Sequence, residues 1–184
     1  SIEDKRFYQH PGVDWHGTLR AFLTNTTSGE VQQGASTLDQ QYVKNYQLLV
    51  LARTDAERRA ATETTPARKI REIRMALSLE NTLTQQLGSK QAAKDAILTR
   101  YLNLVPFGNS SYGIQDAAQT YFGVDAKDLT IPQAAMLAGM VQSSSKLNPY
   151  TNPAGVTERR NTVLGTMAEA DPPNAAQYEA AKSL

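Results

Sequence analysis

Large apolar residues recur every three or four positions along most of this chain, which is the spacing of one helix face. No segment alternates apolar and polar residues as a half-buried strand would. The pattern therefore predicts a mainly α fold, and 184 residues are enough for a single domain with one core. The stripes that carry this prediction are Trp15, Leu19, Phe22 and Leu23; Ile70, Ile73 and Leu77; and Ile97, Leu98, Tyr101 and Leu102.

Capping signals and breakers set the expected bounds of the helices. Ser36 or Thr37 can cap a helix that leads into the apolar run 48–51, and Thr130 with Gln133 has capping-box spacing. Pro106 to Asn109 should interrupt the chain. The expected helices span 14–23, 37–47, 67–83, 95–105, 113–122, 130–139 and 156–169. Residues 52–67 hold almost no large apolar side chain, so we expect a mobile, exposed insertion there.

Composition removes several classes of function. Nineteen Lys and Arg against eighteen Asp and Glu leave a net charge of +1, which gives no basic excess for binding nucleic acid. The absence of cysteine excludes disulfides, thiolate nucleophiles and cysteine-based zinc sites. No P-loop, GxGxxG or HExxH motif occurs. His10 and His16 lie six residues apart, on different faces of a helix, so they are not expected to bind one metal ion together. No metal-ligating residue is predicted.

Glu3 and Asp4 stand beside Phe7 and His10, so a partly desolvated carboxylate could act as a general acid or base. On this stretch alone, a solvated pair of terminal acids is the preferred interpretation, with His10 as a structural hydrogen bonder. Glu72 has Arg68 one turn before it on a face that is otherwise apolar, which indicates a partly buried carboxylate. A surface ion pair fits that spacing equally well.

Lys44, Arg68 and Lys69 could converge with the two acids on one cleft. Cations gathered in this way suit a phosphate-bearing leaving group, although solvated side chains are an equally common outcome. The residues alone do not name a substrate.

Five motifs in order resemble those of the family 51 peptidoglycan glycosyltransferases. They are Glu3-Asp4-x-x-Phe7-x-x-His10-x-Gly12; Gly34-Ala35-Ser36-Thr37-x-x-Gln40-Gln41-x-x-Lys44-Asn45; Arg68-Lys69-x-x-Glu72; Ile97-Leu98-x-x-Tyr101-Leu102-Asn103; and Ala134-Ala135-x-Leu137-Ala138-Gly139 through to Arg159-Arg160-Asn161. One such motif would be weak, but five that cover nearly the whole chain are specific.

The resemblance implies a lysozyme-like helical lobe with a smaller, membrane-proximal jaw lobe. It implies polymerisation of lipid II into β-1,4-linked glycan, with Glu3 as general base and Glu72 as the second functional acid near the donor pyrophosphate. Asp4, Phe7 and His10 would support Glu3. The residues expected to contact substrate are Arg20, Ser36, Thr37, Gln40, Gln41, Lys44, Asn45, Arg68 and Lys69.

The resemblance also implies a place of action and partners. The enzyme would work on the outer face of the plasma membrane, on lipid II and a growing glycan strand. A membrane anchor would lie upstream of Ser1, and in some members a transpeptidase domain would follow Leu184. Other cell-wall synthesis proteins would be partners. No cofactor is expected to be required, with Mg²⁺ or Mn²⁺ as an optional aid at the pyrophosphate. The stripe from Trp15 to Leu23 and the run 48–51 are candidate membrane-facing surfaces, with ordinary core packing as the alternative.

Two other functions stay open. A lysozyme-like hydrolase or lytic transglycosylase would use a glutamic acid on the same general fold but would not need cations for a pyrophosphate. A non-catalytic module that binds lipid II is the second alternative. The Ala-, Arg- and Thr-rich stretch between Asn45 and Arg68 is longer than we expect for the family, and we take it as a weak hint of actinobacterial origin.

Overall fold

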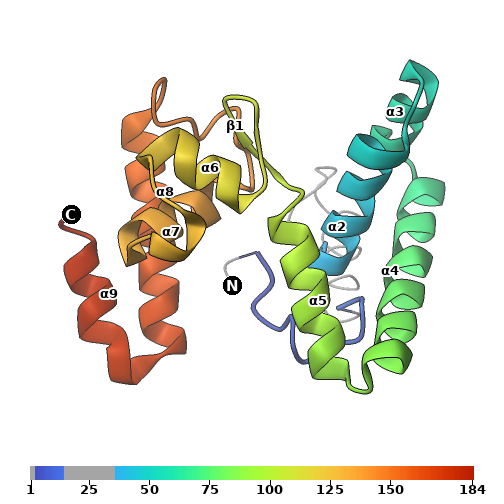
Figure 1. Cartoon of the computed structure of the whole chain (residues 1–184), viewed down its shortest axis with the longest axis horizontal. Helices are drawn as coiled ribbons and strands as arrows, with labels where there is room; N and C mark the ends of the chain where they lie inside the picture. The colour runs from blue at the N-terminus through green and yellow to red at the C-terminus, as the bar shows by residue number, and fades with distance from the viewer. Residues whose placement is uncertain (1–2, 15–35) are drawn as a thin grey trace, which may run out of the picture. The chain divides into compact units, whose positions relative to one another are not determined.

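The computed structural model describes residues 3–14 and 36–184, and the chain divides into two compact units. The N-terminal unit ends at Tyr101, and the C-terminal unit begins at Leu102 (Figure 1). Both are built almost wholly from helices, so the prediction of a mainly α fold is confirmed.

Four α-helices, a π-helical turn and an irregular segment form the described part of the N-terminal unit. Its elements are α2 (Leu38–Tyr46), the π-helical turn η1 (Gln47–Leu51), α3 (Asp55–Thr62), α4 (Pro66–Leu87) and α5 (Lys90–Leu102). α2 packs on α4, and hydrogen bonds between side chains join α2 to α5. Residues 3–14 contain no helix or strand, yet their Phe7 and Val13 side chains are buried.

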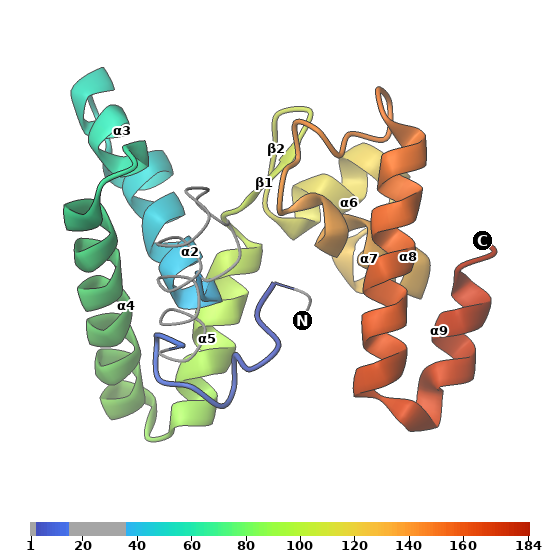
Figure 2. The same cartoon turned by 180° about the vertical axis from the view of Figure 1, so that it is seen from behind.

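The C-terminal unit is a small helical assembly. It contains a hairpin of β1 (Pro106–Gly108) and β2 (Ser111–Tyr112), then α6 (Ile114–Phe122), η2 (Ala126–Asp128), α7 (Ile131–Met140), α8 (Pro153–Ala170), η3 (Pro172–Asn174) and α9 (Ala175–Ala181). Figure 2 shows α8 and α9 as a pair of neighbouring helices at the end of the chain. Small and apolar side chains fill the core between α7, α8 and α9: Ala135, Val163, Leu164 and Ala181.

The predicted caps explain where several helices begin. Thr37 is the N-cap of α2, and its Oγ1 accepts a hydrogen bond from the amide of Gln40. Thr130 and Gln133 form the predicted capping box of α7. At the other end of α4, Gly88 adopts φ 79°, a left-handed conformation that glycine reaches without strain.

The segment 52–67 differs from the expectation. It is exposed along nearly its whole length, as predicted, but it contains the helix α3 instead of irregular chain. The reason is local, because Thr54 and Glu57 form a complete capping box, with the Thr54 hydroxyl accepting from the Glu57 amide and the Glu57 carboxylate accepting from the Thr54 amide. Hydrogen bonds from the backbone amides of Arg53 and Thr54 to its carboxylate lower the pKa of Glu57.

The hairpin was not predicted. Asn109 and Ser110 connect β1 to β2 with φ of 49° and 59°, and two positive φ values in a two-residue loop are those of a type I′ turn. Strands of three and two residues are too short to display an alternating pattern, so the sequence showed only the break at Pro106.

The buried face of α4 and the start of α5 also differ from the expected ones. Ile70, placed in the buried stripe of its helix, is 50% exposed, while the buried face of α4 carries Glu72, Ala76, Glu80 and Leu83. The prediction for Ile70 is wrong because the acids on the opposite face find cationic partners inside the unit. α5 begins at Lys90, earlier than expected, and the Ser89 hydroxyl accepts from the Ala92 amide at its start.

The predicted apolar surface can be tested at one of its two parts. Leu49, Val50 and Leu51 of η1 are all exposed, as expected for the run 48–51. The stripe Trp15, Leu19, Phe22 and Leu23 lies outside the described residues. Within residues 3–14 and 36–184, no helix combines the length and apolar character needed to cross a bilayer.

Candidate active site

Glu3 opens the irregular segment that runs to Asp14 and is half-buried. The next residue, Asp4, is buried, and both of its carboxylate oxygens lie within 3.0 Å of His10 Nε2. Asp4 Oδ2 also accepts from the amide of Leu38, 3.1 Å away, at the first residue of α2. His10 is therefore the structural hydrogen bonder that the sequence indicated, and the neighbour of Glu3 is tied to the start of α2.

Phe7 and Tyr8 attach the same segment to α5. The Phe7 ring is buried and meets the Tyr8 ring edge to face. The Tyr8 hydroxyl donates to Asp95 over 2.9 Å, and burial, followed by this contact, raises the pKa of Tyr8. Side-chain contacts thus hold this segment in place, because it belongs to no helix or sheet.

Tyr101 of α5 connects this segment to the motif on α2. Its hydroxyl donates to Gln41 Oε1 over 2.9 Å. Burial, and then the negative charge of Glu3, raise the pKa of Tyr101, which places the phenol within electrostatic reach of the Glu3 carboxylate. Tyr101 stays neutral and stays a donor. The sequence analysis placed it in an apolar stripe and in the fourth motif but not among the expected site residues.

Glu72 is a buried carboxylate on α4, only 2% exposed, so the alternative of a surface ion pair is wrong. Arg68 Nη1 donates to Glu72 Oε1, and Lys69 Nζ lies 3.5 Å from Glu72 Oε2. Each carboxylate oxygen therefore has its own cation. The Arg68 guanidinium also donates through Nε to the carbonyl of Glu63, just before α4 begins.

Lys69 brings α4 and α2 together. Its ammonium donates to Ser36 Oγ over 2.5 Å and to Gln40 Oε1 over 3.0 Å. Gln40 is 1% exposed, and its Nε2 has no hydrogen-bond partner, so this amide offers a donor inside the site. Ser36 and Gln40 from the second motif and Lys69 from the third thus meet as the sequence predicted.

The electrostatics around Lys69 favour an incoming anion. Burial lowers the pKa of Lys69 most, Glu72 opposes this shift, and Arg68 and Lys44 add to it. Lys44 is therefore close enough for its charge to act on Lys69, as expected of a shared cationic cleft. Among the described residues whose charges act on Lys69, Arg68 and Lys44 are cations and Glu72 is the carboxylate, which leaves a local excess of positive charge.

A sequence of contacts leads from Glu3 to Glu72. The charge of Glu3 acts on Tyr101, which donates to Gln41; Gln41 Nε2 lies 3.5 Å from the Ser36 carbonyl oxygen. Ser36 then accepts from Lys69, which contacts Glu72. All of these groups belong to the N-terminal unit.

Three other residues were predicted to contact substrate: Thr37, Asn45 and Arg20. Thr37 is buried, and its hydroxyl donates to the Gly12 carbonyl oxygen, so its role is to hold the irregular segment. Asn45 is half-buried in the last turn of α2, next to Lys44. Arg20 lies outside the described residues, and its predicted contact with substrate stays a prediction.

The described carboxylates do not form a ready metal site beside Glu72, because both Glu72 oxygens already contact cations. One group of potential ligands does occur among the described residues: Asp4, His10 and Asp39, whose ligand atoms lie within 4.8 Å of one another. Lys94 Nζ lies 3.0 Å from Asp39 Oδ2 and supplies positive charge there. This buried group therefore already holds a cation of the protein's own.

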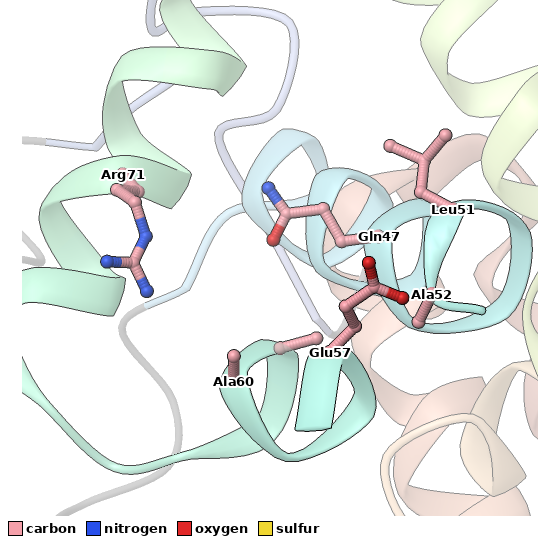
Figure 3. Close-up of a pocket in the computed structure, with 7 residues that line it drawn as sticks. Gln47, Leu51, Ala52, Glu57, Ala60 and Arg71 are labelled. Carbon is pink, nitrogen blue, oxygen red and sulfur yellow. The ribbon is translucent and has the colours of Figure 1, made fainter. Parts of the chain in front are cut away.

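A separate pocket lies between η1, α3 and α4. Figure 3 shows Arg71 of α4 facing Gln47 of η1 and Ala60 of α3 across it. Leu51, Ala52 and Glu57 complete much of its lining, so the helix in the unexpected segment helps to build this pocket. None of the predicted site residues lines it.

The comparisons with known proteins agree with the motifs. A family model described as Transglycosylase matches residues 1–168. The chain is 42% identical to penicillin-binding protein 1A of Streptococcus oralis over 98% of its own length and 26% of that protein. It is 41% identical to penicillin-binding protein 1A of Neisseria lactamica, over 92% of the chain and 18% of the relative.

The chain thus spans about a quarter or less of the length of these relatives. The match nevertheless covers nearly all of the chain itself, including every motif from Glu3 to Asn161. The buried Glu72 with its two cations, the segment that carries Glu3 and the family match converge on one conclusion: the chain belongs to the transglycosylase family, the family 51 peptidoglycan glycosyltransferases.

Proposed function

We propose that this chain polymerises lipid II into β-1,4-linked glycan by displacing the lipid pyrophosphate with inversion at the anomeric carbon. The observation that carries the proposal is the cluster of Arg68 and Lys69 on buried Glu72, joined by contacts to the segment that holds Glu3. Family membership supports the same reaction.

In the proposed reaction, the 4-hydroxyl oxygen of the acceptor GlcNAc attacks C1 of the donor MurNAc. Glu3 takes the hydroxyl proton as the new C–O bond forms, and the bond from C1 to the pyrophosphate oxygen breaks with its electron pair leaving on the phosphate. A positioned base of this kind contributes about 10²–10⁴-fold in rate. Tyr101, which burial and the charge of Glu3 keep neutral, donates to Gln41.

The cations would act on the leaving group. Lys69 and Arg68 contact the Glu72 carboxylate, and a pyrophosphate would offer them more oxygens and more charge. Glu72 would hold the two cations in place until the donor arrives, and Lys44 would add charge from α2. The unpartnered Gln40 Nε2 is a further donor for phosphate oxygen.

No resident cofactor forms part of the proposal. Mg²⁺ or Mn²⁺, where present, would arrive bound to the pyrophosphate, because both Glu72 oxygens are occupied by cations of the protein. We also propose action at the outer face of the plasma membrane, with the exposed Leu49, Val50 and Leu51 against lipid. A transpeptidase domain would accompany the chain, as the relatives are penicillin-binding proteins of several times its length.

The deciding experiment offers the purified protein two substrates in parallel, lipid II and finished glycan strands. We expect polymer from lipid II and no shortening of the strands. Shortened strands with no polymer would instead identify a lytic enzyme of the lysozyme type. Binding of lipid II or of a moenomycin-type inhibitor without either product would identify a non-catalytic binding module.

A further inference from the structure

Lys94 of α5 is completely buried, with a side-chain exposure of 0%. Lysine is almost never found in this state unless its ammonium is paired. The motifs assigned no function to this residue, and its partners Asp39, Glu80 and Phe7 do not belong to the cluster of cations around Glu72. Its environment therefore needs an explanation of its own.

The Lys94 ammonium contacts three elements besides its own helix. It donates to Asp39 Oδ2 of α2 over 3.0 Å and lies 2.8 Å from Glu80 Oε2 of α4. It also lies 4.5 Å from the centroid of the Phe7 ring, a cation–π contact with the irregular segment. One ammonium thus joins α2, α4, α5 and residues 3–14.

Glu80 extends this connection to Gly12. Its Oε2 accepts from the Gly12 amide over 2.5 Å, while the Gly12 carbonyl oxygen accepts from Thr37 Oγ1 over 2.8 Å. Gly12 has φ 31°, and a Cβ there would lie 3.1 Å from the backbone carbonyl of Ala76. The irregular segment is therefore held against α4 at its far end, while Asp4 fixes it to α2 beside Glu3.

Stability alone does not account for this cluster. Buried ion pairs lose as much hydration energy as they gain by attraction, and well-packed apolar residues often replace them at no loss. Here two carboxylates share one ammonium, and Asp39 Oδ1 has no hydrogen-bond partner. What the ammonium provides, and an apolar side chain would not, is directional bonding to several elements at once.

We propose that Lys94 is a positioning residue, whose ammonium fixes residues 3–14 on the three helices and so sets where the Glu3 carboxylate points. The inference rests on the proposed role of Glu3 as base. Because a displacement of about 1 Å at a reacting group can reduce the rate about 100-fold, a cluster remote from the substrate can control turnover.

The test compares two variants with a matched control. Lys94→Met leaves two carboxylates buried without a cation, so we expect it to unfold at a lower temperature. The triple variant Asp39→Asn, Glu80→Gln, Lys94→Met removes every charge of the cluster at similar volume, so we expect it to fold and melt near the wild type. Lys127→Met, at an exposed lysine of the C-terminal unit, controls for the loss of one positive charge.

For the folded triple variant we expect kcat to fall about 10- to 100-fold, while KM for lipid II changes far less, since Arg68, Lys69 and Glu72 are untouched. Hydrogen exchange gives a readout independent of activity. The amides of Gly12 and Val13 should exchange faster than in the wild type, while the amides of α4 stay protected. Lys127→Met should behave as the wild type in both measurements.

Wild-type kcat and unchanged exchange at Gly12 and Val13 in the folded triple variant would overturn the inference. A triple variant that unfolds would make Lys94 a residue of stability, which overturns it as well. If the wild type makes no polymer from lipid II, the proposed function fails, and hydrogen exchange in residues 3–14 still decides whether Lys94 holds the segment.

Discussion

The two units of this chain have cores of different chemistry. Among the described residues, eight of the nine buried polar or charged side chains lie in the N-terminal unit, and Ser111 alone lies in the C-terminal one. The C-terminal core consists instead of alanine, valine, leucine and methionine between α7, α8 and α9. The eight are Asp4, His10, Thr37, Asp39, Gln40, Glu72, Glu80 and Lys94.

This difference separates two tasks. Burying an ionised group has a free-energy cost that apolar packing avoids, so a core rich in such groups indicates that specific positions, rather than stability, determine its composition. The candidate catalytic residues all lie in that unit. The C-terminal unit has the core expected of a stable scaffold.

The largest effect should come from the base. Glu3→Gln keeps the size of the side chain but removes its ability to accept the hydroxyl proton, so we expect a loss of kcat of about 10²–10⁴-fold. Inhibitor binding, measured by fluorescence anisotropy with a labelled moenomycin-type ligand, should be retained. Asp55→Asn, at a carboxylate 82% exposed on α3, is the control. Polymerisation at the wild-type rate would remove Glu3 from its proposed role.

Substitutions in the apolar core of the C-terminal unit should lower stability and leave kcat unchanged. Leu164 is completely buried between α7 and α9, so Leu164→Ala should lower the free energy of unfolding by about 2–5 kcal/mol. Chemical denaturation measures this loss, and Leu184→Ala, at a side chain 83% exposed, should show almost none. We expect the folded fraction to keep the wild-type kcat. A specific fall in kcat without loss of stability would break the division between the units.

A pH-dependent effect is expected at Lys69. Its pKa is lowered, mainly by burial, so it loses its charge at a lower pH than an exposed lysine, and the polymerisation rate should decline on the alkaline side accordingly. Arginine stays charged throughout, so Lys69→Arg should shift the alkaline limb of the rate profile to higher pH. Lys90→Arg, at an exposed position, is the matched control. Identical alkaline limbs in all three proteins would show that Lys69 does not carry the relevant charge.

The smallest effect concerns the excess acid in the buried cluster. Burial raises the pKa of Asp39 most, and Glu80 adds to the shift while Lys94 opposes it; Asp4 and His10 face it from the irregular segment. A raised pKa means that the folded state binds this proton more tightly than the unfolded state. The contribution of Asp39 to stability is therefore greatest at low pH and declines as pH rises from the usual aspartate range through the folded pKa.

Asp39→Asn should accordingly melt at the same temperature as the wild type near pH 4 and above it at pH 7. A rise of about 2–4 °C corresponds to 1 kcal/mol in a chain of this size. Thermal melts at the two pH values measure the difference, with Asp55→Asn again as the exposed control. A variant that melts lower at pH 7 would show that the ionised carboxylate stabilises the cluster.

The sequence predicted the elements and motif residues that depend on local signals. Thr37 and Thr130 cap helices as expected, and the motif residues Ser36 and Gln40 meet at the Lys69 ammonium. A similar signal was overlooked at Thr54, whose spacing to Glu57 is that of a capping box and would have predicted α3.

The buried charges were harder to predict, because hydrophobic periodicity assumes that charged residues face water. Lys94 lies three residues before Ile97 and seven before Tyr101, so its position in the buried stripe was visible, but its type argued against burial. Only the distant partners Asp39 and Glu80, on two other helices, resolve this conflict. For the same reason Ile70 was assigned to the interior, although that face of α4 is exposed.

The irregular segment also has a consequence for the order of folding. Helices α2, α4 and α5 each form backbone hydrogen bonds within the helix itself. Residues 3–14 depend instead on contacts with all three helices: Asp4 with Leu38, Gly12 with Glu80, and Tyr8 with Asp95. Such a segment gains its stable contacts only when these helices are in place, so we expect it to dock after them although it precedes them in the chain. In the proposed reaction, an immature or partly unfolded chain would therefore lack a positioned base, and we expect it to bind substrate without turning it over.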